Sequence, residues 1–137
     1  MSPEKTKLLV DNYPLIFSKI KHVECSDGWY HLLNSLCGVI ENIAKQIPLE
    51  LQGQIHASQI KQKFGGLRFY LNHNTPAIEG AIDLAEELSN NMCEVCGNYG
   101  GHKNINGWIT TLCDIHHKTE LAAYEERMSS YKKKEKK

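Results

Sequence analysis

Residues 93–117 read CEVCGNYGGHKNINGWITTLCDIHH, and this stretch decides the fold of the C-terminal part of the chain. Cys93 and Cys96 stand two residues apart, which lets both thiolates of a tight turn point at one tetrahedral ion. Cys113 and His116 repeat this spacing further along. Two matched pairs predict one structural zinc ion per chain, with a coordination shell closed by four protein ligands.

The fourth ligand has a rival, since His117 also lies within reach of Cys113 on a helix that begins there. His116 is favoured because its spacing from Cys113 equals the spacing of Cys96 from Cys93. Between the two pairs, residues 108–112 form a predicted strand, and residues 114–131 form a predicted helix. A knuckle, a hairpin and a helix that carries the second pair are the layout of a treble-clef zinc finger. A zinc ribbon is the main alternative, and free cysteines in a core would be the reading without metal.

Apolar residues in the N-terminal half recur at helical spacing. The first twenty residues predict a short helix, a break at Pro14 and a second turn. A longer apolar stripe, from Trp29 to Ile47, follows the helix-start sequence Ser26-Asp27-Gly28 and predicts the longest helix of this half. Cys25 and Cys37 fit this scheme as a loop residue and a core residue, so we expect neither to bind metal.

Residues 54–63 and 67–71 are β-prone runs on either side of Phe64-Gly65-Gly66. Two glycines can supply the positive φ of a tight turn, which predicts an antiparallel hairpin. Thr75 and Pro76 then resemble the cap and first residue of a helix. Its outer face carries acidic residues that we expect to be solvated, namely Glu79, Asp83, Glu86 and Glu87.

These elements predict an α+β fold, with helices packed on a small antiparallel hairpin or sheet and a treble-clef-like zinc finger at the C-terminal end. A chain of 137 residues suits a single domain, which we place at 1–131 with its zinc-binding part at about 92–131. Residues 132–137, KKKEKK, predict a disordered lysine-rich tail.

The composition is that of an ordinary soluble protein, with 41% hydrophobic and 23% charged residues. The sequence lacks an apolar run of about 18 residues and a secretory signal, so we expect no membrane partner and a cytoplasmic location. Five cysteines, an odd count, fit a reducing compartment better than a disulfide framework. The net charge is zero, but without the lysine tail the chain has 11 basic and 15 acidic residues, a net charge of −4.

Three segments resemble an uncharacterised family of small proteins from phages and bacterial genomes: DGWYHLLNSLCGVI at 27–40, QIKQKFGGLRFY at 59–70, and CEVCGNYG with GWITTLCDIH within 93–116. Members share a K-F-G-G-L-R-F-Y stretch, a C-E-x-C-G knuckle and a G-W-x-x-T-L-C-x-x-H end. The likeness covers most of the chain up to His116. It implies zinc binding, a viral or mobile-element origin, and His116 as the motif histidine, but it implies no activity.

Residues 112–119, LCDIHHKT, resemble in outline the zinc-bearing HNH nucleases. Those enzymes use a histidine, usually beside an aspartate, to activate water, and further groups to hold a catalytic ion. His102 is the only histidine between the two ligand pairs, and the sequence has no Asp-His dipeptide. It also lacks the common hydrolase, P-loop and metalloprotease motifs. We therefore expect no catalytic residues, and nuclease activity is the least favoured function.

Two binding functions are left. Basic and aromatic residues interleave around the predicted hairpin, which would suit single-stranded nucleic acid if they are exposed; the residues that would bind it are Lys61, Lys63, Arg68 and Tyr70. The competing interpretation, which we favour, buries Phe64 and Phe69 in the core. The small size, the acidic body and the phage-like motifs then favour a non-catalytic module that binds a host protein, with inhibition of a host defence or nucleic-acid-processing complex as one possible outcome.

Overall fold

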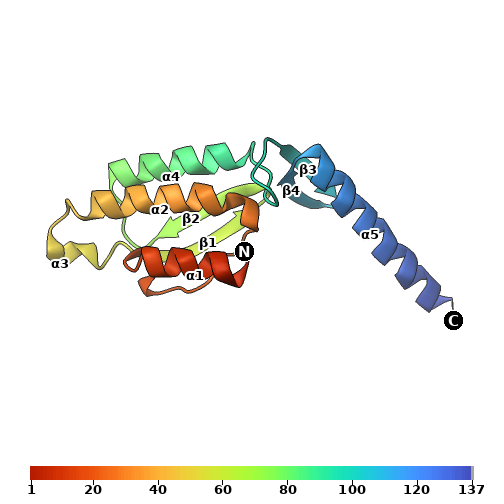
Figure 1. Cartoon of the computed structure of the whole chain (residues 1–137), viewed down its shortest axis with the longest axis horizontal. Helices are drawn as coiled ribbons and strands as arrows, with labels where there is room; N and C mark the ends of the chain where they lie inside the picture. Colours follow the sequence, from red (N-terminus) through yellow and green to blue (C-terminus); the bar gives the residue numbers. More distant parts are fainter. Residues whose placement is uncertain (137) are drawn as a thin grey trace.

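The computed structural model describes residues 1–136 and has the predicted α+β composition, with helices and two small antiparallel sheets. Figure 1 shows a layered body at one end, formed by the first four helices and the first hairpin. The second hairpin and the start of the last helix make a separate finger at the other end. The chain therefore divides into a body, residues 1–92, and a finger followed by a projecting helix.

The N-terminal helices match the predicted pattern. Helix α1 spans Pro3–Asn12, and the hydroxyl of its N-cap Ser2 accepts a hydrogen bond from the backbone of Lys5. After the break come the 3₁₀ turn η1 (Ile16–Ser18), the 3₁₀ turn η2 (Asp27–Trp29), helix α2 (Tyr30–Ala44) and the short helix α3 (Leu49–Gln52). The break at Pro14 and the long second helix are confirmed.

The first hairpin is also confirmed, with β1 at Ala57–Lys63 and β2 at Gly66–Leu71. Its two turn residues, Phe64 and Gly65, have φ values of +52° and +86°, as a two-residue turn of type I′ requires. The expected burial of Phe64 is wrong, since its side chain is 68% exposed, whereas Phe69 is 3% exposed, as expected. Phe64 sits at the tip of the turn, beyond the reach of the core.

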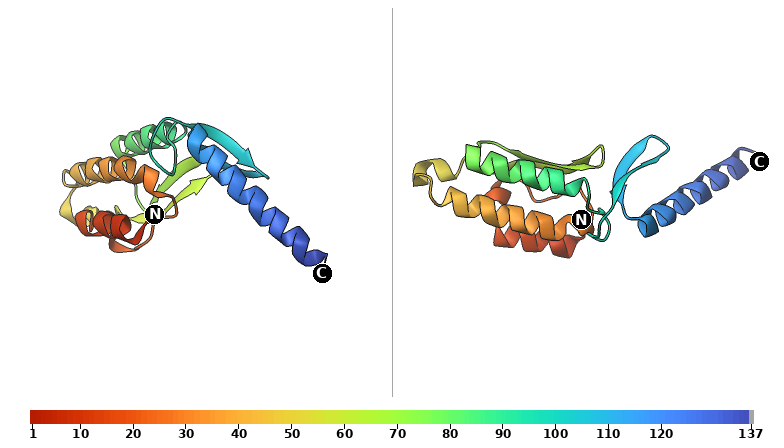
Figure 2. Two further views of the ribbon diagram at one scale, coloured as in Figure 1. Left: turned by 45° about the vertical axis from the view of Figure 1, so that its right-hand side comes forward. Right: turned by 90° about the horizontal axis from the view of Figure 1, so that it is seen from above.

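Helix α4, Pro76–Ser89, begins at Thr75, whose hydroxyl accepts a hydrogen bond from the backbone of Ile78. It packs against both α2 and β2, and Figure 2 shows α2 and α4 side by side beside the first hairpin. The prediction that Glu86 is solvated is wrong. Its side chain is half-buried, and its carboxylate accepts a 3.0 Å hydrogen bond from the backbone of Phe69. The helix thereby supplies an acceptor to the adjacent strand.

A single hydrophobic core lies within the body. Cys37 belongs to it, as predicted, and so does Cys25, which lies in a loop as expected but is buried there. Neither joins the C-terminal cysteines. Burial raises the pKa of the Cys25 thiol to about 12 and also raises the pKa of Cys37, so both stay protonated near neutral pH. The largest fully buried side chains of this core are Trp29, Phe17, Leu9, Ile16, Leu33, Ile40, Ile55, Ile60, Leu67 and Ile78.

The finger contains β3, Gly101–Ile105, and β4, Trp108–Leu112, paired across a turn with positive φ at Asn106 and Gly107. Helix α5 follows at Asp114–Glu135. The lysine-rich end differs from the expected disorder, because residues 132–135 continue this helix; residue 137 lies outside the described part. Lysine is a good helix former, and cations are favoured in the last turn of a helix.

The helices within residues 1–136 include no candidate for a membrane span. None of them combines sufficient length with sufficient hydrophobicity. Even α5, the longest, carries charged side chains along its length.

Candidate metal centre

Four side chains converge where the finger meets the start of α5. Their ligand atoms, the Sγ atoms of Cys93, Cys96 and Cys113 and a ring nitrogen of His116, all lie within 4.8 Å of one another. Cys93 and Cys96 come from the loop after α4, whereas Cys113 is the N-cap of α5 and His116 lies in its first turn. The structure thus brings together the four predicted residues, and His117 lies outside the cluster.

Three of the separations between these atoms are close to the edges of a coordination tetrahedron. The Sγ atoms of Cys96 and Cys113 are 3.9 Å apart, and Nδ1 of His116 lies 3.6 Å from Cys93 Sγ and 3.2 Å from Cys113 Sγ. With metal–sulfur bonds of about 2.3 Å and metal–nitrogen bonds of about 2.0 Å, tetrahedral edges are about 3.5 to 3.8 Å. The cluster can therefore hold one metal ion, with Nδ1 as the histidine donor.

The knuckle that carries the first two cysteines depends on glycine. Gly97 has a φ of +80°, and its N–H donates to the carbonyl of Cys93 over 2.8 Å. A Cβ atom at Gly97 would also lie 2.8 Å from the carbonyl oxygen of Gly28. Only glycine fits this position without strain, because the backbone is left-handed and a neighbouring segment is in contact.

Backbone donors around Cys93 favour its thiolate form. Burial alone would raise the pKa of this thiol, but N–H groups of Cys113, Cys96 and Val95 outweigh burial and lower the pKa to about 7. At Cys96 the net effect is the reverse. The N–H of Asn98 lowers the pKa of this thiol, but burial and the neighbouring sulfurs outweigh it, so the pKa is raised. The thiolate is the form that binds metal.

Glu94, which lies between the two knuckle cysteines, was missed as a site residue. Its side chain is buried, and the carboxylate accepts a 3.0 Å hydrogen bond from the backbone of Ser26 and a 3.1 Å bond from the hydroxyl of Thr110. Ser26 belongs to the body and Thr110 to β4 of the finger. Glu94 therefore joins the knuckle to both regions, and the only sequence indication was an acidic residue inside the C-x-x-C spacing.

The start of η2 fits closely against the knuckle. Gly28 donates its N–H to the carbonyl of Glu94 over 2.7 Å, and a Cβ at Gly28 would lie only 2.3 Å from the carbonyl oxygen of Cys93. The indole N–H of Trp29 donates to the carbonyl of Met92 over 2.8 Å. These contacts set the position of the metal ligands relative to the core, since Trp29 is fully buried there.

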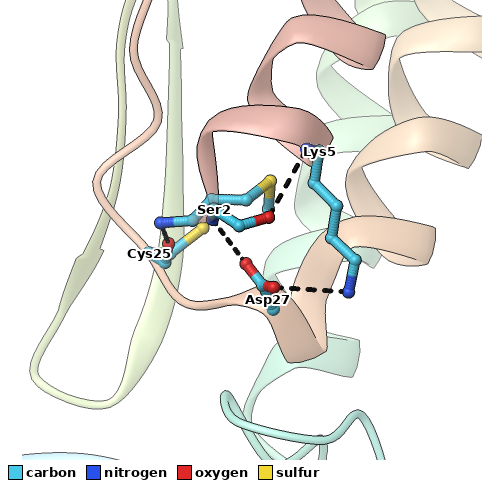
Figure 3. A network of polar contacts seen from close by, with 5 residues as sticks. Ser2, Lys5, Cys25 and Asp27 are labelled. Atoms are coloured by element: carbon cyan, nitrogen blue, oxygen red, sulfur yellow. Dashed lines mark hydrogen bonds and ion pairs between the residues drawn. The ribbon is translucent and has the colours of Figure 1, made fainter.

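The other side of this segment is tied to α1 (Figure 3). The Asp27 carboxylate accepts a 2.6 Å hydrogen bond from the backbone of Ser2, and its second oxygen lies 3.5 Å from the ammonium of Lys5. The terminal amino group of Met1 donates to the carbonyl of Cys25. The segment between Cys25 and Trp29 is therefore held between α1 and the knuckle.

The finger also docks on the tip of the first hairpin. The hydroxyl of Thr111 donates to the carbonyl of Gly65 over 2.6 Å in a buried contact, and the amide of Gln62 donates to the carbonyl of Ile109 over 3.0 Å. On the same side, the ring Nε2 of His102 lies 3.2 Å from Oδ1 of Asn90. The turn of the first hairpin therefore also forms a contact surface for β4.

The predicted nucleic-acid residues lie elsewhere, on the outer face of the first hairpin. Lys61 lies opposite Arg68 in the hairpin, and the adjacent pair, Ile60 and Phe69, is buried on the other face. The ammonium of Lys61 lies 6.0 Å from the ring centre of Tyr70. Within residues 1–136, the cations of this face make no ion pair with a carboxylate. The structure brings the predicted basic residues together, but away from the metal cluster.

An open groove of about 630 Å³ runs between the knuckle, β4 and α5. Its lining includes the aromatic residues Trp108 and Tyr124, and Trp108 is 68% exposed. Charged side chains line it as well, namely Glu24, Glu94, Glu120 and Arg127. Sequence reasoning missed this groove, because its walls come from distant parts of the chain.

Comparisons of the chain with models of protein families, with curated proteins and with solved structures found no match. The donor set and the surfaces around it are therefore the basis for a functional proposal. Three sulfurs and one imidazole nitrogen, in a closed arrangement, are soft and borderline ligands that suit a structural ion.

Proposed function

We propose that the protein is a non-catalytic binding module whose finger is a treble-clef zinc finger holding one structural Zn²⁺ ion. The convergence of three Sγ atoms and one Nδ1 atom within 4.8 Å carries this proposal. Four protein ligands fill a tetrahedral zinc shell and leave no position for a reactive water. The ligands would be Cys93, Cys96, Cys113 and His116.

The metal assignment is tested by elemental analysis of the chain purified without added metal. We expect about one zinc per chain, because a Cys₃His set binds zinc in preference to magnesium or calcium. Protein that is folded in the finger but carries no stoichiometric metal would overturn the assignment.

The proposed partner is another protein, bound in the groove between β4 and α5. Tryptophan, tyrosine and arginine dominate the binding energy of many protein interfaces, and the groove offers Trp108, Tyr124 and Arg127. Three glutamates in the lining favour a partner segment with basic residues. The likeness to phage-encoded proteins makes a host protein the proposed partner, and the host cytoplasm the proposed location.

A pull-down from host lysate, with and without nuclease treatment, tests this partner. We expect the capture of a host protein to persist after nuclease treatment and to be lost in the Trp108→Ala variant. Tyr99→Ala is the matched control, since Tyr99 is 83% exposed but does not line the groove. Capture that is unaffected by Trp108→Ala, or equally weakened by Tyr99→Ala, would contradict the assignment of the groove.

Single-stranded nucleic acid is the second candidate, favoured by the exposure of Phe64 and Tyr70 beside cations that have no carboxylate partner among residues 1–136. Exposed aromatic rings can stack on bases while lysines contact phosphates. If this surface binds an oligonucleotide, affinity should fall steeply with salt and with Lys61→Glu and Lys63→Glu combined. Lys45→Glu, which reverses an exposed charge on another part of the body, is the control. Retained affinity in the double variant would exclude this surface.

A further inference from the structure

Most of helix α5 projects beyond the rest of the molecule. It has 22 residues, and none of them is buried. Figure 1 shows it extending away from the finger, and the additional views agree; its contacts are with β3 and β4 at the finger. Most helical stability in proteins comes from the packing of one face of the helix. A partner for that face would therefore stabilise α5.

The sequence of α5 has a coiled-coil stripe. Five side chains of α5 recur at alternating steps of four and three residues, the spacing of a and d positions in a heptad, whereas Ile115, Ala122 and Ala123 lie off this stripe. Leu121 and Met128 occupy a positions, while His117, Tyr124 and Tyr131 occupy d positions. Leu121 and Met128 are each 37% exposed and Tyr131 is 61% exposed. The stripe is narrow, as in a two-helix seam, and is uncovered beyond the finger.

We propose that α5 pairs with α5 of a second copy of this chain, in antiparallel orientation. The orientation follows from the charges that flank the stripe. With the twofold axis between residues 122 and 123, Leu121 faces the partner's Tyr124 and Met128 faces the partner's His117. Each of these layers occurs twice because the pairing is symmetric.

In that register every flanking pair is attractive. Lys118 lies opposite the partner's Glu125, and Glu120 lies opposite the partner's Arg127, again twice each. None of these four side chains makes an ion pair within the described part of its own chain. Charges at flanking positions set the orientation and partner choice of coiled coils.

In a parallel pair of α5 helices, the charges at the flanking positions would not be complementary. In a parallel two-helix coil, each g residue faces the e residue of the following heptad. Glu120 would then face the partner's Glu125, and Arg127 would face the partner's Lys132. Both pairs are like-charged, so the parallel arrangement is disfavoured.

This surface goes beyond the proposed function, because it concerns self-association and not the capture of another protein. Glu120, Tyr124 and Arg127 also line the groove, so a partner protein and a second copy would share one wall. Trp108 lies on β4, outside α5. The Trp108 variant therefore tests the groove, and the charge variants below test self-association.

Sedimentation velocity of the full metal-loaded chain, over a range of concentrations, tests the pairing. We expect a species of twice the 15.6 kDa of one chain to form as concentration rises. Glu120→Arg alone and Arg127→Glu alone should each abolish it, since each places like charges opposite one another. An equal mixture of these two variants should restore it, because the arginines at positions 120 and 127 of one chain then face the glutamates at positions 127 and 120 of the other.

Glu126→Arg is the matched control, since it makes the same charge change at an exposed position on the opposite side of α5. It should leave the association constant within about twofold of the native value. A native chain that stays monomeric at millimolar concentration would overturn the proposal. Self-association that persists or strengthens in both single variants would also overturn it, because a parallel pair gains attraction from the same substitutions.

Discussion

The body and the finger are held together by different physical means. All 19 members of the hydrophobic core cluster lie at or before Ala85. From residue 93 to residue 136, the buried hydrophobic side chains are Cys93 and Leu112. Burial of apolar surface stabilises the body, whereas the finger has almost no core of its own and relies on its ligand cluster.

This difference follows from size. Segments below about 40 residues seldom bury enough apolar surface to fold alone, and they usually need metals, disulfides or a partner. The finger and α5 have three cysteines that are free of disulfides and gathered around one histidine. Metal binding would then supply the folding free energy that the missing core does not. The two regions should consequently respond to different substitutions.

The largest effect is expected from Cys93→Ser. Structural zinc contributes apparent binding free energies of about 10 to 16 kcal/mol in zinc-finger peptides, so losing one thiolate should release the ion and unfold the finger. The body should keep its helices. Elemental analysis should find no zinc, and amide exchange should accelerate in residues 101–112 but not in α2.

The matched control is Cys25→Ser, the same change at a buried cysteine outside the cluster. It should lower the stability of the body and leave one zinc per chain. If Cys93→Ser keeps its metal and its protected finger, the division between the two regions fails.

Phe69→Ala should have the next largest effect, now on the body. Removing a phenylalanine that is 3% exposed leaves a cavity, and such changes cost about 3 to 5 kcal/mol. Urea denaturation should measure this loss, while zinc content stays at one per chain. Phe64→Ala, at the exposed turn, should stay within about 0.5 kcal/mol of the native free energy of unfolding. Equal losses in the two variants would show that the turn also packs against something.

The features that depend on local sequence were the ones that could be predicted. Ligand spacing in Cys93, Cys96, Cys113 and His116 is set by a tight knuckle and one helical turn, so it can be read without the rest of the fold. The hairpin at Phe64-Gly65-Gly66 was likewise predictable, but only one of the two glycines, Gly65, supplies a positive φ; the other turn residue is Phe64, and Gly66 begins β2.

The features that were missed depend on contacts between distant segments. Glu86 looked like a solvated acid on α4, but the neighbouring strand offers it a backbone donor. Glu94 connects Ser26 and Thr110, which are far apart in the sequence. The lysine-rich end looked disordered by charge repulsion alone, whereas helix propensity and a preceding helix carry it to Glu135.

Glu94→Gln tests how the two regions are joined. The carboxylate accepts from one donor of the body and one of the finger, and an amide would turn an N–H₂ group toward one of them. A buried donor left without its acceptor costs about 1 to 3 kcal/mol. We expect faster amide exchange in β4, with zinc content unchanged. Glu87→Gln on the exposed face of α4 is the control, and an equal effect there would contradict a special role for Glu94.

The smallest effect is expected at Asp27, on the side of η2 that faces α1 (Figure 3). The backbone N–H of Ser2 is the main cause of the lowered pKa of this carboxyl, opposed by partial burial and aided by Lys5. Because the folded-state pKa lies below the ordinary value, the stabilisation is complete above the ordinary pKa. It is lost as the pH falls through the lowered value.

Asp27→Asn should therefore lower the free energy of unfolding of the body at pH 7 by less than about 1 kcal/mol, since the ion pair is exposed. The difference between the native protein and the variant should vanish at a pH below the lowered pKa, where the native carboxyl is also neutral. Acid releases metal from both proteins alike, so the difference between their urea midpoints isolates Asp27. Asp11→Asn is the control, because Asp11 pairs with Lys7 on the surface of α1 and joins no second element. A difference at Asp27 that persists at low pH would mean that the amide disturbs packing and that the charge of Asp27 is not what anchors α1 to the segment facing the knuckle.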